Sequence, residues 1–439
     1  MATQRGFALP PTPDYRIEIA EIEWELSSKK KIRTAAYSGQ IPGRVLQLTE
    51  GKPVAIEIVN RLDRPEIVHW HGQWIPPNVD GAVEEGSPMI PAGSSTLIEF
   101  TPRPAGLHWY HTHAMANRDL KRGLYTGQAG VLHVAPRLNP GAYDPQQFDQ
   151  EQFIVLQDWQ PFYTASDDGS LMVDYTAASI NGRMLGHSEP IRVRLGERVL
   201  LQVLNASATL PHWLVLPGHR FQVLALDGAA VPTQAAVDTL RIGLAERITA
   251  LVTMNQPGVW VLGEAHKDYR DRGMGIVVEY SGQSGKPQES RSGTPRLEKL
   301  TWDYCAFGDA VPQSHTPDVT IPLIFTSRFR GHGALDQWMI NGKSFPDGSP
   351  ILLHQGQRHR LVFENRSVDD HPIHLHRHKF ELVSVAGKRT SGVNKDVVMV
   401  EAGKTVEADL VANNPGDTLF HCHQQDHMDS GFMALFRYA

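Results

Sequence analysis

The 439-residue sequence contains only two cysteines, Cys305 and Cys422. If Cys422 is a metal ligand, no intramolecular disulfide is possible, and the fold must be held by its core alone. No basic block is longer than the KKK at 29–31, and the net charge is −6, so we expect no nucleic-acid partner. No apolar run reaches the roughly 18 residues that span a membrane, so we expect no membrane segment.

The first residues, MATQRGFALPPTPDYR, also lack the apolar stretch that is typical of a secretory signal. Two locations therefore stay open. The chain is either cytoplasmic or a mature exported form, periplasmic or extracellular, whose signal has been removed. Hydrophobic residues make up 41% of the chain, which is enough for a core in each of several domains.

What the sequence does contain is a repeated strand pattern. Short alternating apolar runs recur between Gly, Pro and Asn, with little helical periodicity, which predicts β-strands. Three runs open with Gly and end on Asn, at 51–60, 196–205 and 356–365. They predict three repeated units, each a Greek-key β-sandwich, at 1–140, 150–282 and 299–439. The polar segment 281–296, rich in Gly, Ser and Pro, predicts a flexible linker.

Paired histidines occupy matching positions in the first and third units. Counted from the closing asparagines, they are His69, His71, His374 and His376; counted from the glycine of a later turn, they are His111, His113, His421 and His423. The middle unit has Leu214, Leu216, Gly263 and Ala265 at those counts. Residues i and i+2 of a strand face the same side, so each pair directs two imidazoles into one space. We therefore expect the middle unit to have the same fold but no metal site. Four other histidines fall outside the counted positions of the pairs: His108, His378, His212 and His219.

The stretch HCHQQDH at 421–427 adds a thiolate to this pattern. Imidazole suits zinc, copper, iron and nickel, so the pairs alone do not select a metal. Cys422 with His371 and His427 makes a His2Cys set, which is typical of a blue-copper centre, whereas Cys pairs or an HExxH helix that would indicate zinc are absent. Because strand side chains alternate, Cys422 faces one side and its two histidine neighbours face the other, so HCH can contact two metal centres.

These motifs resemble those of the three-domain multicopper oxidases, the family of laccases, ascorbate oxidase, bilirubin oxidase and bacterial copper-efflux oxidases. The matching motifs are HWHG at 69–72, HTH at 111–113, HPIHLH at 371–376 and HCHQQDH at 421–427. The resemblance covers nearly the whole chain. It implies an all-β fold of three consecutive cupredoxin-like domains, four copper ions, and a middle domain without copper.

The resemblance also implies a role for each matched residue. His371, Cys422 and His427 would bind the type 1 copper, and His69 and His374 the type 2 copper. The type 3 pair would take His71, His111 and His423 on one ion and His113, His376 and His421 on the other. Asp80 matches an acidic proton-relay position of the family, although a turn-forming aspartate has the same local pattern. Cys422 would link the type 1 site to the cluster where O2 is reduced to water.

The electron donor is less well defined by the sequence. The resemblance implies that the axial position of the type 1 copper is Phe432, which cannot coordinate, or Met433 if the loop shifts by one residue. The family glycine after HLH is Arg377, whose charge would favour anionic or neutral donors if it points to the donor. The 11 methionines are scattered, without the Met-rich insert of copper-efflux oxidases.

We therefore expect a monomeric laccase-like enzyme that uses O2 and a phenolic or aromatic amine donor. Two alternatives stay open. One is a metallo-oxidase of cuprous, ferrous or manganese ions, and the other is a non-enzymatic copper-buffering protein.

Overall fold

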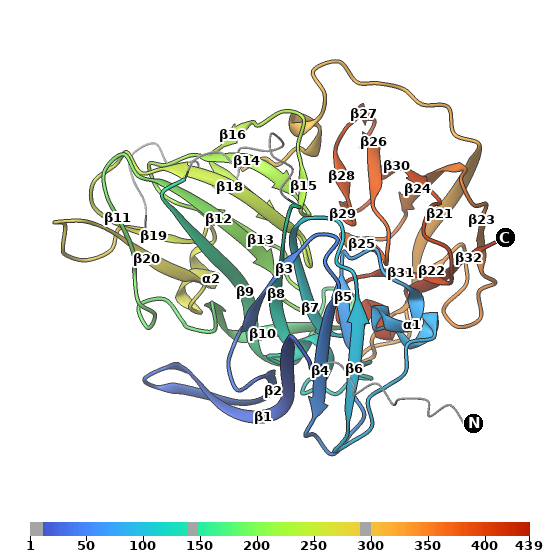
Figure 1. The fold of residues 1–439 in the computed structure, drawn as a ribbon, viewed down its shortest axis with the longest axis horizontal. Helices are drawn as coiled ribbons and strands as arrows, with labels where there is room; N and C mark the ends of the chain where they lie inside the picture. Colours follow the sequence, from blue (N-terminus) through green and yellow to red (C-terminus); the bar gives the residue numbers. More distant parts are fainter. Residues whose placement is uncertain (1–11, 138–147, 290–299) are drawn as a thin grey trace, which may run out of the picture.

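The computed structural model describes residues 12–137, 148–289 and 300–439. Strands dominate these ranges and pair into six sheets, two in each of three consecutive sandwiches (Figure 1). This confirms the predicted all-β fold. The boundaries at 140, 150, 282 and 299 stay predictions, because the linker at 281–296 and the junction before 150 extend outside the described residues.

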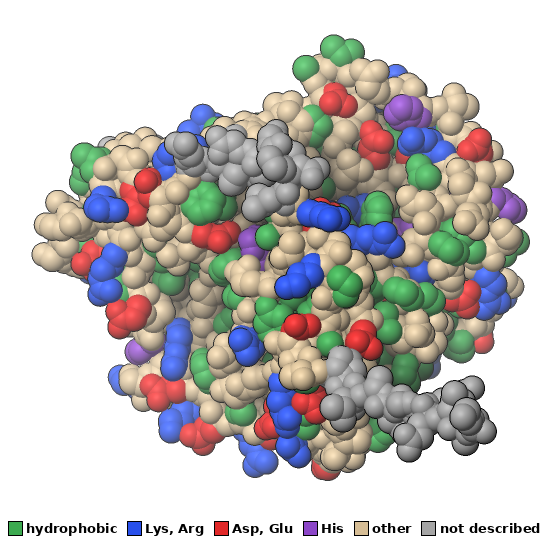
Figure 2. Space-filling model, in the orientation of Figure 1, with side chains coloured by type: hydrophobic (Ala, Val, Ile, Leu, Met, Phe, Trp, Pro, Cys, Tyr) green, Lys and Arg blue, Asp and Glu red, His purple; other side chains and the backbone are tan. Residues whose placement is uncertain are grey.

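On the face of the molecule drawn in Figure 2, neither sign of charge dominates. On the face in Figure 2, acidic and basic side chains are interspersed among hydrophobic ones. Within the described ranges, no helix has the length and apolar composition to cross a bilayer.

The first sandwich packs a sheet of order β2-β1-β4-β6 against one of order β3-β8-β7-β5. Its strands are β1 Tyr15–Ser27, β2 Lys30–Tyr37, β3 Gly43–Thr49, β4 Val54–Asn60, β5 Val68–His71, β6 Ser95–Phe100, β7 Gly106–Thr112 and β8 Ala129–Ala135. Short helical turns are α1 Pro77–Asp80, η1 Val83–Glu85 and η2 Gly123–Tyr125. Alternating apolar side chains such as Ile17, Ile56 and Val134 fill the space between the sheets.

The middle sandwich pairs the sheet β10-β9-β12-β18-β14-β15, to which β16 is added, with the sheet β11-β20-β19-β13-β17. Its elements are β9 Gln150–Ala165, β10 Leu171–Ile180, β11 Ile191–Val193, β12 Arg198–Asn205, β13 His212–Val215, β14 Phe221–Leu226, β15 Ala229–Ala230, β16 Ala236–Val237, β17 Thr239–Ile242, β18 Arg247–Thr253, β19 Val259–Glu264, α2 Lys267–Asp271 and β20 Gly275–Tyr280. The order of corresponding strands repeats that of the first sandwich.

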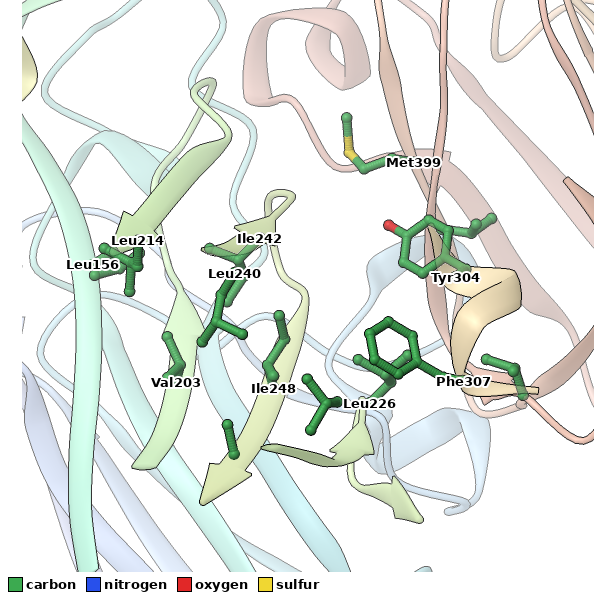
Figure 3. Packing of buried hydrophobic residues seen from close by; sticks show 14 of the residues in the cluster. Leu156, Val203, Leu214, Leu226, Leu240, Ile242, Ile248, Tyr304, Phe307 and Met399 are labelled. Atoms are coloured by element: carbon green, nitrogen blue, oxygen red, sulfur yellow. The ribbon is translucent and has the colours of Figure 1, made fainter. Parts of the chain in front are cut away.

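The third sandwich repeats the middle one strand for strand, with sheets β22-β21-β24-β30-β26-β27, joined by β28, and β23-β32-β31-β25-β29. Its elements are η4 Tyr304–Phe307, β21 Val319–Arg328, β22 Gln337–Ile340, β23 Ile351–Leu353, β24 Arg358–Asn365, β25 His371–Leu375, β26 Phe380–Val385, β27 Lys388–Arg389, β28 Asn394–Lys395, β29 Val397–Val400, β30 Thr405–Val411, β31 Thr418–Cys422, α3 Gln425–Asp429 and β32 Met433–Tyr438. One hydrophobic cluster continues from the middle sandwich into Tyr304, Phe307 and Met399 (Figure 3). This shared core holds the two sandwiches together.

The asparagine that closes each repeat has a structural role. Asn60, Asn205 and Asn365 are buried. In each case the side-chain oxygen accepts the backbone N–H two residues later, and the side-chain nitrogen donates to a backbone oxygen of a neighbouring segment, that of Ile90, Ile242 or Val400. The side chain therefore satisfies backbone groups that the end of the strand leaves unpaired.

The predicted match between residues of the middle unit and the paired histidines, counted from Asn205, is wrong by one residue. His374 lies opposite His421 in the third sandwich, and the residue opposite the corresponding Gly263 is Val215 rather than Leu214. Leu214 instead packs inside the core near Leu156 (Figure 3). The cause is a loop after Asn205 that is one residue longer, and a shift of one residue turns every side chain to the other face.

The shift also changes the assignment of His212. His212 lies opposite Ile242 on β17, as His371 lies opposite Val400 on β29. His212 is therefore the counterpart of His371, a candidate ligand that is not one of the counted paired positions.

Candidate metal centres

The first candidate centre joins Cys422 to two histidines of the third sandwich. Cys422 ends β31, His371 begins β25, and His427 lies in α3. The Cys422 Sγ lies 3.8 Å from Nδ1 of His371 and 3.6 Å from Nδ1 of His427. All three side chains are buried, and their donor atoms lie within 4.8 Å of one another. One sulfur and two imidazoles therefore converge on a single point.

Both imidazoles of this centre are neutral. Burial lowers the pKa of His371 to about 3. Burial, together with His371, lowers the pKa of His427 well below 6.5. The Oγ of Ser367 lies 2.7 Å from Nε2 of His371, which leaves Nδ1 to face the sulfur. Two neutral imidazoles with one soft sulfur form a donor set that fits copper.

Phe432 and Met433 lie on opposite faces at the start of β32. The ring centre of Phe432 lies 4.7 Å from that of His371, in the same core cluster as Cys422. Met433 instead lies opposite His421 in the strand pairing and packs in a separate apolar cluster. The side chain that faces the first centre is thus a phenyl ring.

A second candidate centre lies between the first and third sandwiches. Eight histidines face one another there: His69 and His71 in β5, His111 in β7 and His113 just after it, His374 in β25 and His376 just after it, and His421 in β31 with His423 just after it. None is more than 7% exposed. The ring of His69 stacks on that of His376 at 3.9 Å, and the ring of His71 on that of His374 at 3.8 Å. Each stacked pair spans the interface, so the centre needs both sandwiches.

Several nitrogens of these rings have no hydrogen-bond partner among the described residues. They are Nε2 of His69, His111 and His374, Nδ1 of His71 and both nitrogens of His423. In addition, Nε2 of His421 lies 3.0 Å from Nε2 of His376 and 3.5 Å from Nε2 of His113. Buried polar atoms almost always have partners. Converging unpaired nitrogens therefore indicate that metal ions are their partners, and the residues fit a multinuclear site.

Protonation of the rings agrees with a metal site. Burial, followed by the proximity of neighbouring rings and of other charged groups, lowers the pKa well below 6.5 for His71, His111, His113, His374, His376, His421 and His423. Neutral rings keep a lone pair for a metal.

Asp80, at the end of α1, holds two of the histidines. Its Oδ2 lies 2.8 Å from Nδ1 of His376, and its backbone oxygen lies 2.9 Å from Nδ1 of His69. Glu85 is buried beside it, with Oε1 3.4 Å from the same nitrogen of His376. Burial and the nearby Asp80 raise the pKa of Glu85. Asp80 thus fixes the tautomers of both rings, and Glu85 lies beside the ring of His376 alone.

Asp396, between β28 and β29, holds two other histidines. Its Oδ1 lies 3.1 Å from Nε2 of His71, and its backbone oxygen lies 2.7 Å from Nδ1 of His374. The sequence analysis identified Asp80 but missed Asp396. No local pattern could have indicated it, because His71 lies 325 positions away in the chain.

Arg377 does not lie at the donor edge, which corrects the expectation that its charge selects donors. The side chain is fully buried between the first and third sandwiches. Its guanidinium donates to backbone oxygens of Ile75, Asn414, Pro415 and Asp417 and to the hydroxyl of Thr418. The backbone at this residue is left-handed, with φ of 58°, so strand alternation does not predict where the side chain points.

The remaining histidines near the motifs have other partners. Nε2 of His108 lies 3.0 Å from the backbone oxygen of Pro104, and Nε2 of His378 lies 2.6 Å from the Tyr438 hydroxyl. Cys305 is only partly buried, and burial raises the pKa of its thiol to about 11.

A cleft of about 250 Å³ opens beside His427, between the middle and third sandwiches. Its apolar wall includes Leu244, Met399 and Trp338, whose ring centre lies 4.0 Å from that of His427. Four carboxylates also line it: Asp336, Asp369, Asp370 and Asp426. A small molecule in this cleft would touch a ligand of the first centre.

Comparisons with known proteins agree with this geometry. Three family models described as multicopper oxidase match residues 18–139, 150–274 and 318–439. Multicopper oxidase MmcO of Mycobacterium tuberculosis is 28% identical, over 93% of this chain and 83% of that protein. Laccase-3 of Thanatephorus cucumeris is 24% identical, over 98% of this chain and 91% of that protein.

Among solved structures, Fet3p, described as a multicopper oxidase that functions in iron import, has the same fold. The TM-score is 0.80 at 18% identity, over 97% of this chain and 90% of that one. The three sandwiches therefore have the cupredoxin-like fold that the sequence motifs imply.

Proposed function

The chain belongs to the multicopper oxidase family, and from this premise we propose that it is a laccase-like oxidase of phenolic or aromatic amine donors. Its cofactor is a set of four copper ions, one type 1, one type 2 and two type 3. When bound, these ions would supply one-electron redox chemistry between the donor and O2. Each O2 takes up four electrons and four protons and yields two waters, and each phenol gives up one electron and one proton.

We assign the ligands as the motifs imply. The type 1 ion takes His371, Cys422 and His427, and the type 2 ion takes His69 and His374. The type 3 ions take His71, His111 and His423, and His113, His376 and His421. The grouping of donor atoms supports two of these sets directly, since His371, Cys422 and His427, and His113, His376 and His421, each lie within 4.8 Å of one another.

The protein connects the two centres through one strand. Cys422 faces the sandwich core, and its neighbours His421 and His423 face the interface, so a short covalent path joins the donor side to the O2 side. Asp80 is our candidate proton relay. Its Oδ2 is held by His376, and its Oδ1 has no hydrogen-bond partner among the described residues.

The cleft beside His427 is the observation that carries the proposal. Trp338, Leu244 and Met399 give it an apolar wall that suits an aromatic ring, in contact with a ligand of the type 1 site. A planar donor lying there needs no coordination to give up an electron.

The carboxylates of the cleft favour metal-ion oxidation as a second candidate. Asp336, Asp369, Asp370 and Asp426 are hard oxygen donors of the kind that ferrous and manganese ions accept. Variant Asp336→Asn separates the two functions, because it should weaken turnover of ferrous ion much more than turnover of a neutral phenol.

The test of the proposed function begins with copper-loaded protein. We expect the intense visible band of thiolate-to-copper charge transfer, the near-ultraviolet band of a type 3 pair, and O2 uptake with a phenol. A copper-loaded protein that consumes no O2 with phenols, aromatic amines or metal ions would leave only the copper-buffering alternative.

A further inference from the structure

Arg247 is a fully buried arginine of the middle sandwich that contacts all three sandwiches. It begins β18 and is 0% exposed. Its Nε donates to the backbone oxygen of Leu107 in the first sandwich at 3.2 Å, and its two terminal nitrogens donate to backbone oxygens of Ala245 and Asp227 in its own. These contacts fix the guanidinium in place.

The same guanidinium donates hydrogen bonds from both terminal nitrogens to the carboxylate of Asp396 in the third sandwich. Nη1 lies 2.6 Å from Oδ1, and Nη2 lies 2.6 Å from Oδ2. A bidentate pair of this kind fixes the plane of the carboxylate as well as its charge. Oδ1, which Arg247 holds, is also the oxygen that accepts from Nε2 of His71.

Among the described residues, no other cation is paired with the Asp396 carboxylate. Lys395 pairs with Asp227 and Glu246, and Lys379 donates to the backbone oxygen of Asp227. Arg247 is therefore the residue that orients Asp396.

The backbone of the first sandwich leaves room for the ion pair of Arg247 and Asp396. Gly72, directly after His71, has φ of 82°, and a Cβ there would lie 2.8 Å from Oδ2 of Asp396 and 2.9 Å from Nη2 of Arg247. A glycine at this position lets the arginine and the carboxylate pack against the strand that carries His71.

We propose that Arg247 is a positioning residue of the second centre, where the type 2 ion and the two type 3 ions would bind (the trinuclear centre). It fixes Asp396, which in turn fixes the ring of His71 by its side chain and the ring of His374 by its backbone. The middle sandwich, which supplies no copper ligand, thus determines how ligands from both other sandwiches are oriented. The inference rests on the proposed function, because it assigns these histidines to copper.

The experiment compares wild type with Arg247→Met and Arg247→Lys after copper loading. The type 2 copper spectrum by electron paramagnetic resonance and the rate of reoxidation by O2 report on the trinuclear centre. The visible band and its rate of reduction by hydroquinone report on the type 1 site. Changes to groups that orient metal ligands typically cost about 10- to 100-fold in affinity or activity.

For Arg247→Met we therefore expect an altered type 2 spectrum or loss of type 2 copper. Reoxidation should slow by about 10- to 100-fold, while the visible band and its reduction rate stay unchanged. Arg247→Lys keeps the positive charge but cannot make the bidentate contact with Asp396, so the type 2 copper spectrum of this variant should change to a smaller extent. If Arg247→Met does not fold, the lysine variant decides the question.

Arg241→Met is the matched control. Arg241 also joins the middle sandwich to the third, through ion pairs with Asp370 and Glu401, but it touches no group that holds a cluster histidine. Its type 2 spectrum should match wild type. Type 2 spectra and reoxidation rates of the Arg247 variants that equal those of wild type would overturn the inference. A wild-type protein with normal type 2 copper but no oxidase activity would instead overturn the proposed function.

Discussion

The middle and third sandwiches contain the same interior site in two chemical versions. The residues Cys422, His371 and His427 of the third sandwich correspond to Glu264, His212 and Tyr269 of the middle one. His427 and Tyr269 each lie five residues after the strand position, in the equivalent short helices α3 and α2. The two rings at each site meet edge to face, with centres 5.2 Å apart in the third sandwich and 5.9 Å apart in the middle one.

A serine lies beside the corresponding histidine in both versions. Ser367 Oγ lies 2.7 Å from Nε2 of His371, and Ser207 Oγ lies 3.2 Å from Nε2 of His212. The scaffold around the ring is thus shared, and the difference lies in the groups that face it.

In the middle sandwich the ring lies between two carboxylates. Asp158 Oδ2 lies 2.9 Å from Nε2 of His212, and Glu264 Oε2 lies 3.0 Å from Nδ1. Burial alone would lower the pKa of His212, but the two carboxylates outweigh burial and raise it to about 10. An imidazolium has no lone pair for a metal. A glutamate at the position of the thiol, together with Asp158, therefore gives a buried ion cluster where the third sandwich has its proposed metal site.

The largest expected effect is that of a substitution in the third sandwich, at the proposed type 1 copper site. Cys422→Ser removes the sulfur ligand and the covalent path to the second centre, so the visible charge-transfer band should disappear. O2 uptake with a phenol should fall by more than the roughly 100-fold that loss of a supporting group can cause. Serine fits the same space, so thermal unfolding of the copper-free protein should change little. Undiminished O2 uptake would contradict the proposed electron path.

The ion cluster of His212, Asp158 and Glu264 in the middle sandwich should contribute to folding stability and not to the redox reaction. His212→Gln leaves the buried Asp158 without its cation and Glu264 with only the partly exposed His266, and breaking such a cluster costs about 3–5 kcal/mol. In copper-free protein, His371→Gln should cost only about 1 kcal/mol, because this neutral ring makes one hydrogen bond to a serine. Urea unfolding of the two variants measures the difference. Equal losses would show that the two sites are energetically alike.

The pH dependence of stability should separate the same two sites. The pKa of His212 rises from 6.5 to about 10 on folding, so its stabilisation is complete below pH 6.5 and is lost as the pH rises toward 10. The free energy of unfolding of copper-free wild type should therefore fall across this range. The fall should be smaller in His212→Gln. A pH profile that the substitution leaves unchanged would show that the ring is not charged in the folded state.

The smallest effect concerns the ring over the type 1 site. Phe432→Met would place a thioether next to the copper and stabilise the cupric state, so the reduction potential should fall by about 60 mV, which is tenfold in a one-electron equilibrium. Met433→Leu should leave the potential unchanged, because Met433 faces the other side of the strand. Redox titration of the visible band measures both. A shift in the second variant alone would reverse the assignment of the axial position.

The metal motifs could be predicted because their information is local. In HWH, HTH and HCH, strand alternation alone decides which side chains share a face, and three repeats give the register. The same reasoning failed for Leu214, where one extra loop residue shifts the count, and for Arg377, where a left-handed backbone breaks the alternation.

The sequence by itself determined the all-β repeats, the histidine pairs and the two-faced HCH strand, because each depends on residues a few positions apart. Only the tertiary structure decided that Phe432 rather than Met433 faces His371, that Arg377 is buried, and that Arg247 grips Asp396 across 149 positions. Such contacts depend on how three sandwiches dock, and docking is set by whole packed surfaces rather than by local spacing.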